Sequence, residues 1–197
     1  MYIAVGIALV VGALGGIVFS SVQGDNYGPP QSANRGAPQQ QSAQSGGLSP
    51  QQASQILALE QRVAANPQDL RSWVSLGNTY FDAGRAVKAI GAYNRALGLK
   101  PNDANVLTDL GVMYRRNGQP AEAIRTFDRA IAVNTRHEQA RFNKGVVQMY
   151  DLGDINTAVA TWEGLLAVNP SATAANGVPI AQIIADAKKQ LGSGGGQ

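Results

Sequence analysis

The sequence predicts an all-α protein, a helical solenoid of three stacked helix pairs with a capping helix at each end, preceded by a single transmembrane helix. Three observations lead to this prediction. Apolar residues recur at helical spacing through residues 49–191, similar segments follow one another at intervals of about 34 residues, and residues 2–22 contain no charged side chain. Together they divide the chain into an anchor, a linker and a folded domain.

Composition excludes several classes of function before any motif is considered. The 197 residues include no cysteine, one histidine, and 16 Lys and Arg against 13 Asp and Glu. Such a chain has no disulfide, thiolate metal site or cysteine nucleophile, and no cluster of imidazoles. Because no run of Lys or Arg exceeds two residues, nucleic acid is not an expected partner. We expect a binding protein that is not an enzyme, with no catalytic residue, metal or cofactor.

The first 22 residues predict a membrane anchor. As a helix, residues 2–22 would rise about 31 Å, close to the ~30 Å hydrocarbon core of a bilayer. A cleaved signal peptide is the alternative: small residues near Ser20 and Ser21 allow cleavage, although no Lys or Arg precedes the apolar run. Few basic residues follow the span, so we expect a single-pass membrane protein with its N-terminus inside and its soluble domain outside, which in a bacterium is the periplasm.

Small side chains form a stripe along this predicted membrane helix. Such a stripe lets two helices approach closely, which predicts a homodimer through the membrane helix or packing against another span. The alternative is that Gly and Ala are simply common in membrane helices. The stripe recurs every four residues, at Ala4, Ala8, Gly12, Gly16 and Ser20.

Residues 23–48 predict a disordered linker. They are rich in Gln, Gly, Pro and Ser, and they offer too little aliphatic surface to offset the entropy lost on ordering the chain. A flexible chain of this length has a typical reach of ~25–30 Å, so the folded domain at 49–191 would stay near the membrane. The same composition predicts a flexible tail at 192–197.

The folded domain contains three similar units. WVSLGNTYFDAGRAVKAIGAYNRALGLKP begins at Trp73, and its pattern returns from Leu107 and again from Phe142. In each unit a glycine separates two apolar-periodic stretches, which predicts two helices joined by a turn. Equivalent positions hold Trp73, Leu107 and Phe142; Tyr80, Tyr114 and Met149; Gly84, Gly118 and Gly153; Ala89, Ala123 and Ala158; and Tyr93, Phe127 and Trp162.

These units predict repeats at about 70–103, 104–137 and 139–172. Capping helices are expected at about 50–65, where Ser49 and Gln52 can form a capping box, and at about 179–191. The third unit departs from the pattern, because Gly145 stands where leucine is expected and the preceding turn, 134–138, is read as one residue longer. The six helices of the units are expected near 70–83, 86–99, 104–117, 120–133, 139–152 and 155–168.

The period and the residues at these positions resemble the tetratricopeptide repeat (TPR). The resemblance implies a TPR helical solenoid in which the first helix of each pair lines a concave groove. The mixed side chains of that groove would suit a peptide or helix of a client protein, and the alternative is a solvated packing surface. By resemblance, the groove residues are Val74, Asn78, Phe81, Thr108, Val112, Arg115, Asn143, Val147 and Tyr150.

Some TPR domains clamp a C-terminal carboxylate with lysines and asparagines at set positions of the groove. Here Asn78 and Lys144 match that pattern, whereas Val74, Asp109 and Ala140 do not. Because Asp109 would repel a carboxylate, this clamp is not expected.

Both ends of the domain resemble a narrower family, the TPR subunits of cytochrome c maturation and of the haem lyase in nitrite reductase assembly. The segments are LEQRVAANPQDLRSWVSLGNTYFDAGR and TWEGLLAVNPSATAANGVPIAQIIADAKK. The resemblance implies a periplasmic, membrane-associated domain that holds an apocytochrome c helix, with haem-lyase subunits as further partners. The alternatives are a scaffold in another envelope machine (secretion, pilus or outer-membrane assembly) and a receptor facing the cytoplasm.

Overall fold

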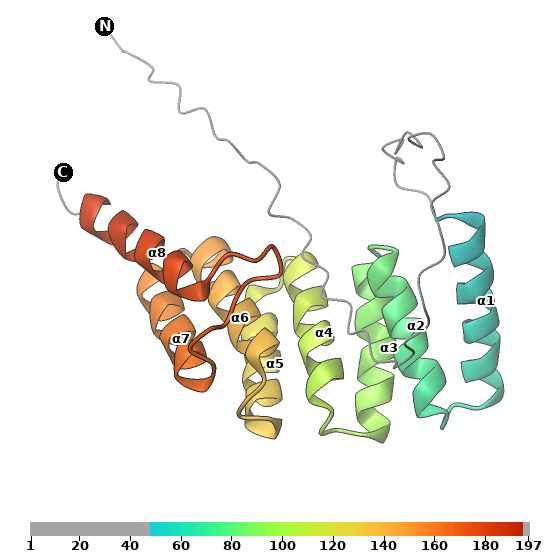
Figure 1. Cartoon of the computed structure of the whole chain (residues 1–197). Helices are drawn as coiled ribbons and strands as arrows, with labels where there is room; N and C mark the ends of the chain where they lie inside the picture. The colour runs from blue at the N-terminus through green and yellow to red at the C-terminus, as the bar shows by residue number, and fades with distance from the viewer. Residues whose placement is uncertain (1–47, 195–197) are drawn as a thin grey trace, which may run out of the picture.

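The structure is a computed structural model that describes residues 48–194. Its helices stand side by side in a curved row from α1 to α8 (Figure 1), and the described residues contain no strand, only an isolated bridge between Thr173 and Pro179. The predicted all-α solenoid is therefore confirmed. The elements are α1 (Pro50–Ala65), α2 (Leu70–Asp82), α3 (Ala86–Leu99), α4 (Ala104–Arg116), α5 (Pro120–Val133), α6 (Glu138–Val146), η1 (Val147–Asp151), α7 (Ile155–Val168) and α8 (Ile180–Gly194).

Local sequence signals set where these helices begin and turn. The first helix of each pair follows an N-cap side chain, Asp69, Asp103 or His137, which accepts a hydrogen bond from the backbone three residues on. The turn inside each pair needs a left-handed residue, so glycines with φ near +70° occupy it. α1 begins with a complete capping box between Ser49 and Gln52.

A glycine on the first helix of each pair packs against an aromatic ring on the second. A Cβ at Gly111 would lie 2.5 Å from the Phe127 ring, and the other two glycines are equally tight. The helices can approach this closely only because the glycine has no side chain. The three pairs are Gly77 with Tyr93, Gly111 with Phe127, and Gly145 with Trp162.

The extra residue of the third unit lies inside its first helix. α6 continues into the π-helical turn η1, where the Leu152 N–H bonds to the Val147 carbonyl at 3.1 Å. A π-helical turn bonds five residues back, so it accommodates one additional residue without ending the helix. The expected longer turn at 134–138 is wrong, and the third unit begins at Glu138 rather than at 139.

Arg141 supports this corrected register. It lies 34 residues after Leu107, so it, and not Phe142, is the equivalent of Trp73. Trp73 Nε1 donates to the carbonyl oxygen of Pro67 at 2.9 Å, and Arg141 Nη2 donates to the equivalent oxygen of Thr135 at 2.9 Å. The Nε of Arg141 is buried without a partner, the cost of placing a guanidinium where tryptophan packs in the first unit.

Helices cover both ends of the stack. The second helices of the first two units each bury two alanines, Ala89 and Ala96 on α3 and Ala123 and Ala130 on α5. At the equivalent positions of α1, 34 residues before those of α3, stand Gln55 and Arg62, and both are exposed. A polar outer face of this kind keeps the end of a solenoid in water. At the other end, α8 packs on α7 through Ile180, Ile184 and Ala187.

The predicted anchor at 1–22, with its small-residue stripe, and all of the linker but Leu48 lie outside the described residues. Leu48 itself is half-buried against the core, and α8 continues to Gly194, beyond the expected start of the tail. Among the helices of residues 48–194, none has the length and apolar character needed to cross a bilayer.

Candidate functional site

The helices α2, α4 and α6 are neighbours and form one wall of the solenoid, called here the A wall. On α2, the predicted residues Val74, Asn78 and Phe81 are three and four residues apart and share one side of the helix. Val74 and Phe81 are half-buried, and Asn78 is exposed. The Asn78 Oδ1 accepts a hydrogen bond from the Tyr93 hydroxyl at 2.9 Å, and its amide NH₂ has no acceptor among residues 48–194.

On α4, two of the three predicted residues are accessible. Val112 and Arg115 are half-buried, but Thr108 is fully buried, and its hydroxyl donates to the Ala104 carbonyl at 2.7 Å. The assignment of Thr108 to the groove is therefore wrong. A short hydroxyl side chain can satisfy itself on the preceding turn of its own helix, and here it lies beneath its neighbours.

On α6, the register changes which residues face the A wall. Val147 is fully buried in the core, so its assignment to the groove is wrong, whereas Tyr150 is 58% exposed and Asn143 is half-buried. Counting from Glu138, the equivalents of Val74 and Asn78 are Phe142 and Val146. The sequence carried a signal for this register, because Gly77, Gly111 and Gly145 are spaced by 34 residues.

Charged side chains link adjacent units along one edge of the A wall. The Arg116 guanidinium lies over the Phe81 ring, 4.5 Å from its centroid, and Arg115 Nε bonds to Asp151 Oδ2 at 2.5 Å. A cation over an aromatic ring contributes about 0.5–1 kcal/mol at exposed sites. Each arginine therefore joins α4 to a different neighbouring helix, and both are already engaged before any ligand arrives.

The arrangement does not support the carboxylate clamp. Asp109 is half-buried, and burial, with the charges of Asp103 and Asp82, raises the pKa of Asp109 to about 7. A carboxylate ligand beside it would raise that pKa further, at an energetic cost. Lys144, one of the two matches, instead pairs with Asp128 of α5 at 2.6 Å.

Residues of α4 and α6 also line a pocket of about 530 Å³, called here the end pocket, whose lining combines polar side chains with the apolar Phe142 and Leu165. The turn 134–137, the start of α6 and the arm 171–175 line it. Backbone bonds from Ala174 N to Val178 O at 2.8 Å and from Ile180 N to Ala172 O at 3.0 Å hold this arm. Sequence reasoning missed the arm because no helical periodicity marks the stretch between α7 and α8.

His137 caps α6 and contacts α4 at the end pocket. Its Nδ1 accepts from the Ala140 N–H at 3.2 Å, so in the neutral ring Nε2 carries the proton and donates to Asn105 Oδ1 at 3.0 Å. Protonation of Nδ1 would remove the cap. Burial lowers the pKa of His137 below its usual value, in keeping with this neutral form.

This cap predicts a pH-dependent stability. Because the folded-state pKa of His137 is lowered, its contribution is complete above about pH 6.5 and is lost as the pH falls through the folded-state value. We expect the wild type to lose about 1 kcal/mol relative to His137→Asn between pH 7.5 and pH 5, since asparagine caps without titrating. Urea unfolding at the two pH values measures the difference, and parallel curves for the two proteins would contradict it.

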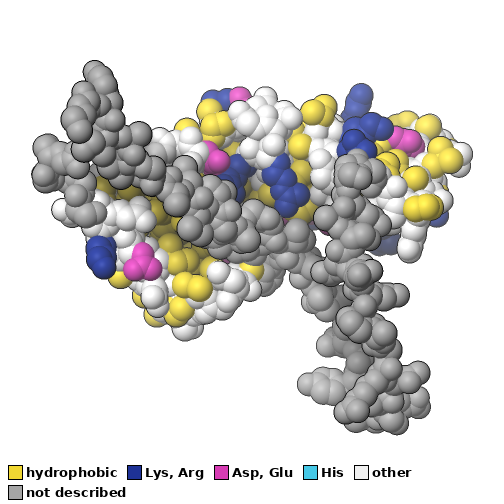
Figure 2. All heavy atoms as spheres, turned by 90° about the horizontal axis from the view of Figure 1, so that it is seen from above, with side chains coloured by type: hydrophobic (Ala, Val, Ile, Leu, Met, Phe, Trp, Pro, Cys, Tyr) yellow, Lys and Arg dark blue, Asp and Glu magenta, His cyan; other side chains and the backbone are white. Residues whose placement is uncertain are grey.

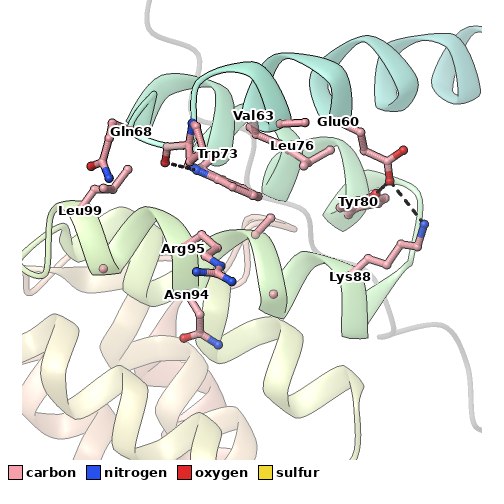
Figure 3. A pocket seen from close by; sticks show the side chains of 15 residues that line it. Glu60, Val63, Gln68, Trp73, Leu76, Tyr80, Lys88, Asn94, Arg95 and Leu99 are labelled. Carbon is pink, nitrogen blue, oxygen red and sulfur yellow. Dashed lines mark hydrogen bonds and ion pairs between the residues drawn. The ribbon is translucent and has the colours of Figure 1, made fainter.

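A second concavity lies between α1 and α3, on a different side of α2 from Val74, Asn78 and Phe81. Its volume is about 890 Å³, and Trp73, Leu76 and Tyr80 of α2 line it together with residues of α1 and α3 (Figure 3). Gly91 and Gly98 of α3 keep it open, because neither has a side chain to fill the space. At one end Glu60 accepts from the Tyr80 hydroxyl and pairs with Lys88 at 3.6 Å.

Charge on the molecular surface is mixed. Among the described side chains that are visible in Figure 2, Lys and Arg lie in separate groups with acidic side chains near some of them, and they form no continuous basic stripe of the kind that tracks a phosphate backbone. Within residues 48–194, no group of three His, Asp or Glu side chains is placed to hold a metal ion. The candidate binding surfaces of residues 48–194 are the A wall, the end pocket and the concavity between α1 and α3.

The family described as the cytochrome c-type biogenesis protein H TPR domain matches residues 37–175. One crystal structure of MamA is 26% identical, with a TM-score of 0.63, and the match covers 70% of this chain and 77% of that chain. A second MamA structure is 24% identical, with a TM-score of 0.62 and coverage of 71% and 74%.

The first TPR of Spaghetti (RPAP3), bound to the HSP90 peptide SRMEEVD, is 20% identical, with a TM-score of 0.52 and coverage of 71% of this chain and 94% of that chain. At this identity the likeness shows the fold alone, as it does for the second MamA structure. The comparison with curated proteins gives no match.

Proposed function

Because the chain belongs to the family of the cytochrome c-type biogenesis protein H TPR domain, we propose that its A wall holds a peptide or helix of an apocytochrome c during cytochrome c biogenesis. The family match over residues 37–175 is the observation that carries this proposal. A TPR domain is a protein-interaction module, and the family narrows the kind of client. The chain would act by binding alone, without catalysis.

The A wall has the composition that such a client needs. Half-buried apolar side chains lie on each of its three helices, with Phe81 on α2, Val112 on α4 and Phe142 on α6. A helix in a groove inserts anchor side chains at positions i, i+3, i+4 and i+7 between such residues. The free amide of Asn78 would fix polar groups of the same client.

The proposal includes the membrane. Residues 1–22 would anchor the chain, and the linker at 23–48 would let the domain reach clients near the periplasmic surface of the bilayer. Haem attachment to a c-type cytochrome uses the client's own C-x-x-C-H motif. The lack of cysteine in this chain is compatible with a role that presents the client rather than modifying it.

Calorimetric titration of the full chain with a peptide of an apocytochrome c C-terminal helix tests the proposal. We expect Phe81→Ala to weaken binding about tenfold, since truncating a central aromatic anchor typically costs 1–2 kcal/mol. Val87→Ala is the control, because Val87 is 69% exposed on α3 and is not part of the A wall. Circular dichroism confirms that both variants remain folded.

Two results would overturn the proposal. One is a wild-type chain that does not bind the peptide, and the other is equal binding by Phe81→Ala and the wild type. Photo-crosslinking in the membrane from Tyr150, which is 58% exposed, identifies the client directly. Capture of secretion, pilus or outer-membrane assembly proteins in place of cytochromes would support the scaffold alternative.

A further inference from the structure

We propose that the end pocket binds a carboxylate of the client, either an acidic side chain or a chain terminus. This inference rests on the proposed function and adds the chemistry recognised at one end of the A wall. The residues of the end pocket are not those of the TPR carboxylate clamp, which is not expected here because of Asp109. The pocket is lined by polar groups from the turn 134–137, from α4 and α6, and from the arm 171–175.

The side-chain amides of Asn105 and Asn134 in the end pocket each have a fixed orientation. The Arg136 N–H donates to the side chain of Asn134 at 3.0 Å, so the atom facing it must be Oδ1 and the NH₂ points elsewhere. His137 Nε2 is a donor because Nδ1 already accepts from Ala140, so Asn105 also accepts through Oδ1 at 3.0 Å. The amide nitrogens of Asn105 and Asn134 are therefore donors that have no acceptor in the described part of the chain.

Arg136 places an unpaired cation in the same pocket, as far as residues 48–194 are concerned. The guanidinium of Arg136 makes no hydrogen bond or ion pair with residues 48–194, and the same holds for the side chain of Asn143. Arginine presents five N–H donors and no acceptor, in a geometry that fits a carboxylate. In contrast, Arg115 and Arg141, which do not line the pocket, already have partners.

Two acceptor atoms that line the pocket, one on Glu138 and one on Asn169, already have donors. Glu138 is the one carboxylate among the residues that line the pocket, and its Oε2 accepts from Asn169 Nδ2 at 3.0 Å. The Oδ1 of Asn169 accepts from the backbone and hydroxyl of Ser171 at 3.1 and 3.0 Å. Glu138 Oε1, with its share of the negative charge, remains in the same pocket as the unpaired Arg136 guanidinium and the three amide donors. Because these donors outnumber that remaining carboxylate oxygen, the pocket favours a group that only accepts hydrogen bonds. An ionised carboxylate is such a group.

The location links the end pocket to the A wall. Phe142 and Asn143 line the pocket and belong to the wall helix α6. A client helix lying along the wall with its C-terminal end over α6 would bring its free carbonyls, and any terminal carboxylate, to these donors. The start of α6 adds the positive end of a helix dipole, a small favourable contribution.

Three small probes separate the sources of the carboxylate. N-acetyl-Leu-Phe supplies a chain terminus, N-acetyl-Leu-Glu-amide supplies a side-chain carboxylate, and N-acetyl-Leu-Phe-amide supplies neither. Each is titrated into the full chain in detergent while NMR follows the side-chain NH₂ signals of Asn105, Asn134 and Asn143. We expect shifts at these signals with either carboxylate probe and none with the neutral amide. The carboxylate probe that binds more tightly shows whether the pocket prefers a chain terminus or an acidic side chain.

Arg136→Ala should weaken binding of the carboxylate probe at least fivefold. Arg129→Ala is the matched control, because it removes the same charge from an exposed position outside the pocket. Shifts of equal size with the neutral probe, no shift with either carboxylate, or equal loss in the two arginine variants would each overturn the inference. Since the probes do not depend on an apocytochrome, failure of the client titration and failure of the pocket are distinguishable.

Discussion

Replacing Gly145 with alanine is expected to lower the free energy of unfolding by about 3 kcal/mol. A Cβ at this position would overlap the Trp162 indole, which is fully buried and has no room to move. Inserting atoms into a packed site of this kind forces side chains off their rotamers or helices apart, at a typical cost of 1–3 kcal/mol. The effect should reach the top of that range because the ring, and not a flexible chain end, meets the new atom.

Urea unfolding followed by circular dichroism measures this change. Gly91→Ala is the matched control: Gly91 lies inside α3, and a Cβ there meets nothing within 4 Å. Helix propensity alone should make the control more stable by about 0.5–1 kcal/mol. A Gly145→Leu variant tests the register, because the pattern counted from 139 expects leucine there. Stability equal to or above the wild type in that variant would contradict the register that begins at Glu138.

The repeated part of the fold could be predicted because each element has its own signal. Apolar periodicity, the glycine at each turn and the N-cap at each first helix all indicate the same helix boundaries. When such local signals agree, the fold can be predicted from the sequence. Ser49 and Gln52 place the start of α1 in the same way. Ala89, Ala123 and Ala158 hold equivalent positions in the three units, and all three are fully buried.

The candidate site was harder to predict, because a one-residue change inside a helix has no strong local signal. From the end of η1 onward, residues such as Tyr150 keep the spacing to the turn glycine that identifies their equivalents in the other units. Residues before η1, such as Phe142, are one position further from that glycine than their equivalents are. An alignment based on the later residues therefore assigns each earlier residue to a position that is wrong by one. Thr108 shows a different limit, since position alone does not reveal that a hydroxyl is satisfied by its own helix.

The largest effect on the C-terminal half is expected from Trp162→Ala, a loss of about 3–5 kcal/mol, typical of removing a buried tryptophan. Trp162 is fully buried, stacks on Phe142 with 6.3 Å between ring centroids, and donates from Nε1 to the Phe142 carbonyl at 3.1 Å. The substitution leaves a cavity and also removes the donor to that carbonyl. Truncating a part-buried hydrogen bond adds to the cost of the cavity.

The loss should be local, because the core is divided into two clusters. One cluster joins α1 to α5, and the other joins α7, α8 and the arm around Trp162. Helix α6 with η1 is the junction, since Ala140 and Val147 pack in the first cluster and Phe142 in the second. In a solenoid each unit contacts only its neighbours, so the stability of one end can fall while the other end is retained.

Native-state hydrogen exchange resolves the two halves. In Trp162→Ala, amides of α7 and α8 should lose protection while those of α2 to α5 keep most of theirs, and the end pocket should lose its carboxylate probe. Trp73→Ala is the control at the other end, where a half-buried indole donates to the Pro67 carbonyl at 2.9 Å. It should lower protection in α1 and α2 and spare α7 and α8. Uniform loss across all helices in either variant would mean that the two clusters unfold as one unit, and that α6 transmits stability along the solenoid rather than separating its halves.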